Sequence, residues 1–127
     1  MILLMQQKEM ATLLLHMTIM RKNVRQGFKK NYGTKEGKEV LASYDEVKTT
    51  LSEILKLEEE AGEVLEGPQV LHFNIKEIEM LDSFLTFYNK EVNESLGDKN
   101  IHQKDREQID TLKEIKEQLD EVRAAYA

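Results

Sequence analysis

The sequence contains no cysteine and no tryptophan, and only one proline and six glycines among its 127 residues. Without cysteine, the chain can form no disulfide, no cysteine-ligated zinc site and no thiol nucleophile. This absence fits a reducing compartment, and we expect a cytoplasmic protein. Because proline and glycine interrupt helices, their scarcity beside 33% charged and 40% hydrophobic residues is typical of long amphipathic helices.

The sequence also lacks a long apolar run. The apolar start MILLM is interrupted by QQKE, and no basic segment precedes it, so we expect neither a signal peptide nor a membrane span. A chain of 127 residues can bury about two thirds of its unfolded surface. We therefore expect one domain over residues 1–127.

Apolar residues recur every three or four positions along most of the chain, which predicts helices with one buried side each. We expect a first helix over residues 3–32, ended by Gly33, and a second helix that ends at Gly67 and Pro68. The residues expected to be buried in these two helices are Met10, Leu13, Met17, Met20, Val24, Phe28, Val40, Tyr44, Val47, Leu51, Ile54, Ala61 and Leu65.

Two further helices are expected after an extended connector over residues 68–75, where the apolar period changes to two. A strand is the less favoured interpretation of the connector, because no partner strand is visible. Asn74 with Glu77 predicts a capping box at the third helix, and Asn100 with Gln103 a similar start for the fourth. The residues expected to be buried here are Ile78, Leu81, Leu85, Tyr88, Val92, Ile109, Leu112, Ile115, Leu119, Val122 and Tyr126.

Four such helices predict an all-α fold, an antiparallel up-and-down four-helix bundle with long helices and an extended connector between the second and third. The alternative is a helical hairpin or three-helix unit that completes its core by dimerising.

Carboxylates form two short motifs. Glu59, Glu60 and Glu63 spell EExxE, and Glu79 and Asp82 spell ExxD. The pair resembles the motif of the all-α nucleotide pyrophosphohydrolases of the MazG type. The resemblance implies a Mg²⁺ ion bound against a nucleoside triphosphate. The ligands it implies are Glu60, Glu63, Glu79 and Asp82, with Glu59 assisting.

Helix geometry favours a different interpretation of the same carboxylates. With Ala61 and Leu65 in the core, Glu59 and Glu63 point nearly opposite to it, so these residues would form a solvated surface. We therefore expect no metal and no cofactor, with Mg²⁺ as the alternative. The basic segment RKNVRQGFKK lacks the interleaved aromatic residues that stack on bases, and we expect no nucleic-acid partner.

The first helix carries a second apolar side. Leu4, Leu15 and Ile19 lie roughly opposite its core stripe, so a subunit or another protein should bind there, unless the connector covers it. We therefore expect a small non-enzymatic protein that acts by protein–protein interaction or self-association through this helix, as a regulator, adaptor or immunity-type factor. The alternative is the pyrophosphohydrolase.

Overall fold

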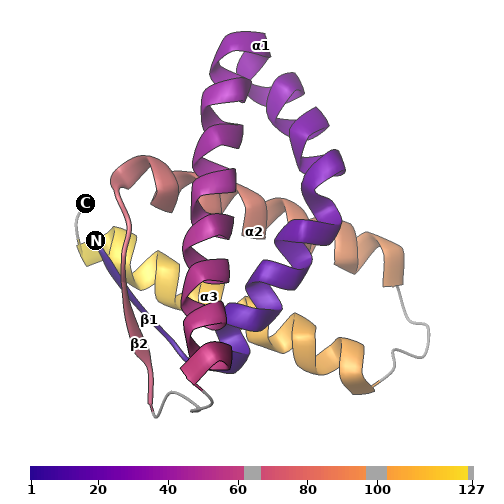
Figure 1. Cartoon of the computed structure of the whole chain (residues 1–127). Coiled ribbons are helices and arrows are strands. Elements are labelled where there is room, and N and C mark those ends of the chain that lie inside the picture. Colours follow the sequence, from indigo (N-terminus) through magenta and orange to yellow (C-terminus); the bar gives the residue numbers. More distant parts are fainter. Residues whose placement is uncertain (62–66, 97–102, 126–127) are drawn as a thin grey trace.

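The computed structural model of the chain describes residues 1–61, 67–96 and 103–125. Helices dominate it, and two short strands pair with each other (Figure 1). In chain order the elements are β1 (Ile2–Met5), α1 (Gln7–Ala61), β2 (Gln69–His72), α2 (Ile75–Leu96) and α3 (Gln103–Ala125).

Helix α1 is broken at Gly33, where φ is 86°. This left-handed conformation is strained for any residue with a Cβ, which explains why glycine stands there. The break separates a first arm, residues 7–32, from a second arm, residues 34–61, and the two arms run back along each other. Gly37 lies just past the turn, where an added Cβ would be only 3.0 Å from the carbonyl oxygen of Phe28, so the arms meet there backbone to backbone.

Two contacts join the arms farther down. Arg21 binds Asp45 through two hydrogen bonds of 2.9 and 2.8 Å, and the buried Tyr44 hydroxyl donates to the carbonyl oxygen of Met17. Burial raises the pKa of Tyr44, so the phenol stays protonated and remains a donor. The predicted division of the helices at Gly33 is therefore confirmed. The predicted start of the first helix at residue 3 is wrong, because residues 2–5 form β1 and the helix begins at Gln7.

Strands β1 and β2 form an antiparallel ribbon in which Leu3 lies opposite Leu71 and Leu4 opposite Val70. The Met1 ammonium group donates to the Phe73 carbonyl at 3.1 Å, and the Phe73 amide donates to the Met1 carbonyl at 2.9 Å. The ribbon thus closes a contact between the start of the chain and the segment before α2.

Helix α2 begins at the predicted capping box. The backbone amide of Asn74 donates to the Glu77 carboxylate at 3.0 Å, and the backbone amide of Glu77 donates to the side-chain oxygen of Asn74 at 2.8 Å. Helix α3 packs against α2, where Asp82 binds Lys116 and Arg123.

One hydrophobic core connects all five elements. The predicted apolar stripes supply most of it, and the ribbon adds Leu3, Met5 and Leu71. The fully or almost fully buried members of the predicted stripes are Met10, Leu13, Met17, Val24, Phe28, Tyr44, Val47, Leu51, Ile78, Leu81, Leu85, Tyr88, Leu112, Ile115 and Leu119.

The predicted four-helix bundle is wrong. The described part of the chain forms three helices and a two-stranded sheet, and the arms of α1 stand upright while α2 and α3 run across them (Figure 1). The connector does not simply lie along helices: residues 69–72 pair with residues 2–5 and cover part of the core as a ribbon. Helices that share the core with a sheet are not held parallel to one another, so most described stripe residues are buried as predicted while the predicted arrangement of the helices is wrong. Of the predicted stripe residues, Leu65, Tyr126 and the side chains of Ala61 and Val92 lie outside the described part of the chain.

Candidate functional site

The ribbon is apolar on both faces. Leu3, Met5 and Leu71 point into the core, whereas the alternate residues face outward. Ile2 is 46% exposed, Leu4 45% and Val70 53%. We call these three side chains the ribbon face. Two of them are direct cross-strand neighbours, so they form a connected apolar surface rather than scattered exposed residues.

The two edges of the ribbon differ. On the β1 edge, the Gln118 side chain of α3 accepts a hydrogen bond from the Leu4 amide at 2.6 Å and donates one to the Leu4 carbonyl at 2.8 Å. An amide side chain thus occupies the position that a third strand would take. On the β2 edge, the outward backbone groups of Val70 and His72 bind no group within the described ranges. This edge is open to an extended chain.

A second exposed apolar surface lies on the first arm of α1. Leu15 is 45% exposed and Ile19 64%, and the two are one helical turn apart. We call this pair the helix patch. The connector does not cover it, because residues 69–72 are paired with β1 instead.

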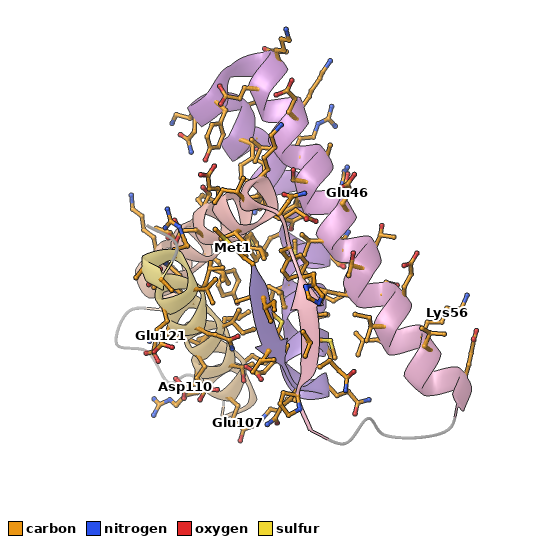
Figure 2. All side chains as sticks on the ribbon, turned by 90° about the vertical axis from the view of Figure 1, so that its left-hand side faces the viewer. Met1, Glu46, Lys56, Glu107, Asp110 and Glu121 are labelled. Carbon is orange, nitrogen blue, oxygen red and sulfur yellow. The ribbon has the colours of Figure 1, made fainter. Side chains whose placement is uncertain are left out.

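Of the three residues predicted to bind a partner, Leu15 and Ile19 lie together, and Leu4 lies elsewhere. The sheet and the first arm both turn their buried residues toward the same core, so their exposed residues point in different directions. In Figure 2 the ribbon faces the viewer and the first arm lies behind it. The molecule therefore has two separate apolar surfaces.

His16 lies beside the helix patch but belongs to the packing between helices. Its Nε2 atom shares a hydrogen bond of 2.9 Å with the Gln108 side chain of α3, and its ring meets the edge of Tyr88 with a centroid distance of 5.0 Å. The histidine therefore fixes the first arm against α2 and α3.

The structure describes only some of the carboxylates of the two acidic motifs. Glu60 is exposed and lies 4.0 Å from Lys56, and Glu79 is exposed on α2. The side chain of Glu59 and the whole of Glu63 lie outside the described residues. Among the side chains that the structure does describe, no three His, Cys, Asp or Glu residues are grouped so that they could hold a metal.

Asp82, the last residue of the ExxD motif, is engaged by cations. Lys116 donates to one of its oxygens at 2.6 Å, and Arg123 lies 2.9 Å from the other. Burial works against the charged form of Lys116, but its hydrogen bonds to Asp120 and Asp82 outweigh this, so its pKa is raised. In this arrangement Asp82 holds α3 against α2.

A hollow of about 380 Å³ lies between the tip of the first arm and α2. Phe28 and Phe84 line its apolar part, and a hydrogen bond of 2.8 Å between the Tyr32 hydroxyl and Ser83 lies in its wall. Asp82 and Lys90 also line the hollow, and Asp82 is already bound to Lys116 and Arg123.

Sequence reasoning missed two residues of the ribbon face, Ile2 and Val70. In the structure, the exposed Ile2 and Leu4 alternate with the buried Leu3 and Met5. The first five residues are all apolar, however, so nothing in the sequence distinguishes the inner from the outer positions.

No protein-family model matches the chain, and no curated protein or solved structure matches it. Across residues 1–61, 67–96 and 103–125, none of the helices is both long enough and apolar enough to cross a membrane.

Proposed function

We propose that this protein acts by binding another protein chain, as a regulator, adaptor or immunity-type factor, and not by catalysis. The observation that carries the proposal is the exposure of connected aliphatic side chains on a molecule whose core is already filled. Leu4 and Val70 are direct cross-strand partners in the ribbon, and Leu15 and Ile19 are exposed one helical turn apart on the first arm.

The energetics favour a partner at these surfaces. Full burial of one leucine, isoleucine or valine side chain contributes about 1.5–3 kcal/mol. The ribbon face and the helix patch together hold five such side chains, each about half exposed. Part of this free energy is recovered if a partner covers them, and the open β2 edge adds backbone donors and acceptors that an extended segment can pair with.

A photo-crosslinking experiment in cells tests the proposal. A photoreactive residue placed at Ala11, which is exposed one helical turn before Leu15, should give a discrete protein adduct. The double variant Leu15→Ser, Ile19→Ser should lose this adduct and keep its helical circular dichroism. The matched control Leu57→Ser removes an aliphatic side chain that is 66% exposed on the second arm, and it should keep the adduct. Loss of the adduct in the control, or its survival in the double variant, would refute the helix patch as a binding surface.

A metal titration separates this proposal from the magnesium-dependent pyrophosphohydrolase suggested by EExxE and ExxD. A ligand at 100 times its dissociation constant stabilises a folded protein by about 2.7 kcal/mol, which is easily seen as a higher melting temperature. We expect no rise with Mg²⁺ or Mn²⁺, with or without a nucleoside triphosphate. A clear rise that Glu63→Gln abolishes would establish a metal site at these motifs, and it would favour the enzyme over our proposal.

A further inference from the structure

The helix patch continues into a basic stripe. Leu15, Ile19, Lys22, Gln26 and Lys29 follow each other at steps of three and four residues, and all five are exposed. No Asp or Glu occurs between residues 10 and 35. The outer side of the first arm is therefore aliphatic toward its start and positively charged toward the turn.

The ribbon face borders a surface of the opposite charge. Exposed carboxylates repeat along α3 at the same steps of three and four residues, which places them on one side of the helix. The members of this acidic stripe are Glu107, Asp110, Glu114, Glu117 and Glu121. Gln118, which binds Leu4, stands next to the stripe, four residues after Glu114 and three before Glu121. Figure 2 views the molecule from this side and shows α3 beside the ribbon, with Glu107, Asp110 and Glu121 along it.

The surface around the acidic stripe has a net negative charge, although some basic residues lie near it. Lys8 shares a hollow with Glu107, Asp110 and Glu114 at the start of α1, and Arg106 precedes the stripe. Lys113 is exposed beside Glu114. Lys116 is bound by Asp82 and Asp120 on another side of α3. The five carboxylates of the stripe therefore outnumber the three nearby cations Lys8, Arg106 and Lys113.

We propose that the first arm of one copy of this chain docks on the ribbon face of another copy. Leu15 and Ile19 of the first copy would cover Ile2, Leu4 and Val70 of the second, and Lys22 and Lys29 would lie along its acidic stripe. The inference rests on the proposed function and names the partner as a second copy. Apolar surface faces apolar surface in this arrangement, and each charged stripe meets its opposite.

The two surfaces lie on different sides of the molecule, so the contact is head-to-tail. Each copy then offers one free surface at each end of an assembly, and the copies form open chains or closed rings instead of stopping at a two-fold dimer. An overall net charge of −6 opposes association, but the part of the arm that docks, from Leu15 to Lys29, contains no Asp or Glu. Because the charged stripes are exposed, high salt should weaken the assembly.

Mixing two variants tests the head-to-tail contact directly. The ribbon variant carries Leu4→Ser and Val70→Thr, and the arm variant carries Leu15→Ser and Ile19→Ser. By light scattering after size exclusion, the wild type should exceed the 14.8 kDa of one chain as its concentration rises, and each variant alone should stay at 14.8 kDa. Mixed in equal amounts, they should form a species of twice that mass that grows no further, because each retains the surface that the other has lost.

A control and a charge reversal complete the test. Leu57→Ser removes an aliphatic side chain that is 66% exposed outside both surfaces, and it should leave the assembly unchanged. Lys22→Glu with Lys29→Glu should abolish assembly, and Glu114→Lys with Glu121→Lys on a second chain should restore pairing with it. Circular dichroism and melting temperature monitor the fold of every variant.

Three results would overturn the inference: a wild type that stays at the mass of one chain at every concentration, variants that assemble alone, or variants that do not pair when mixed. The crosslinking experiment separates these from failure of the proposed function. An adduct with a different protein that still depends on Leu15 and Ile19 would keep the function and reject a second copy as the partner.

Discussion

The two faces of the ribbon are built from the same kinds of residue and have opposite environments. Leu3 and Leu71 are buried, whereas their neighbours Leu4 and Val70 are about half exposed, although all four are aliphatic and lie within one pair of strands. The difference shows that hydrophobicity alone does not assign a residue to the core. Position in the strand pair decides it, and the outer residues are left available for a partner.

The largest expected effect tests this comparison most directly. Leu3→Ala removes a fully buried side chain and should lower the free energy of unfolding by about 2–5 kcal/mol. Leu4→Ala, the next residue along the strand, should change it by less than about 0.5 kcal/mol in the monomer. Urea unfolding measures both. Equal losses at the two positions would mean that the ribbon face is also packed.

The edges of the ribbon offer a second comparison of intermediate size. Gln118→Ala removes two hydrogen bonds to the Leu4 backbone, and with about 0.5–1.5 kcal/mol for each bond it should destabilise the protein by about 1–2 kcal/mol. Amide hydrogen exchange should accelerate at Leu4 and stay unchanged at Leu71, which is paired inside the ribbon. Glu117→Ala, at the exposed neighbouring position, is the control and should change neither value.

The smallest effect concerns the surface contact between the arms of α1. The hydrogen bond from Arg21 lowers the pKa of Asp45. The contribution of this ion pair to the free energy of unfolding is therefore fully present above the ordinary aspartate pKa of about 3.9. It is lost as the pH falls through the lower pKa that Asp45 has in the folded protein. Both side chains are about two fifths exposed, so we expect no more than about 1 kcal/mol at neutral pH.

Urea unfolding of Asp45→Asn at neutral and acidic pH checks this. The variant should be slightly less stable than the wild type at neutral pH, and the two should converge in acid. An Asp45→Asn protein that keeps the wild-type dependence on pH would show that the ion pair does not contribute. Tyr44→Phe serves as the buried counterpart, because it removes the hydrogen bond to Met17 without changing a charge.

The sequence predicted the parts of this fold that depend on near neighbours along the chain. The stripes around Leu13, Leu51 and Leu81, the break at Gly33 and the capping box at Asn74 all result from contacts within a few residues, and each is found in the structure.

The parts that depend on distant contacts were not predictable in the same way. Residues 2–5 form strand β1 only by pairing with β2, nearly seventy residues later, because neither strand is stable alone. The crossing of α2 and α3 over the arms follows from how the ribbon shares the core with them. Similarly, the exposure of Leu15 and Ile19 was expected from helix geometry, whereas Ile2 and Val70 could be placed only once the strand register was known.

Gly37 gives the hairpin of α1 a mechanical property. An added Cβ there would meet three backbone atoms of Phe28 and Lys29 at 3.0–3.2 Å, and backbone cannot move aside as a flexible side chain can. A methyl group at this position would push the two arms apart close to the break at Gly33. Because the arms are long, a small displacement there would become a larger separation at their far ends. The separation of the arms thus depends on the absence of a side chain at Gly37, and Gly37→Ala gives an experimenter a simple means of changing it.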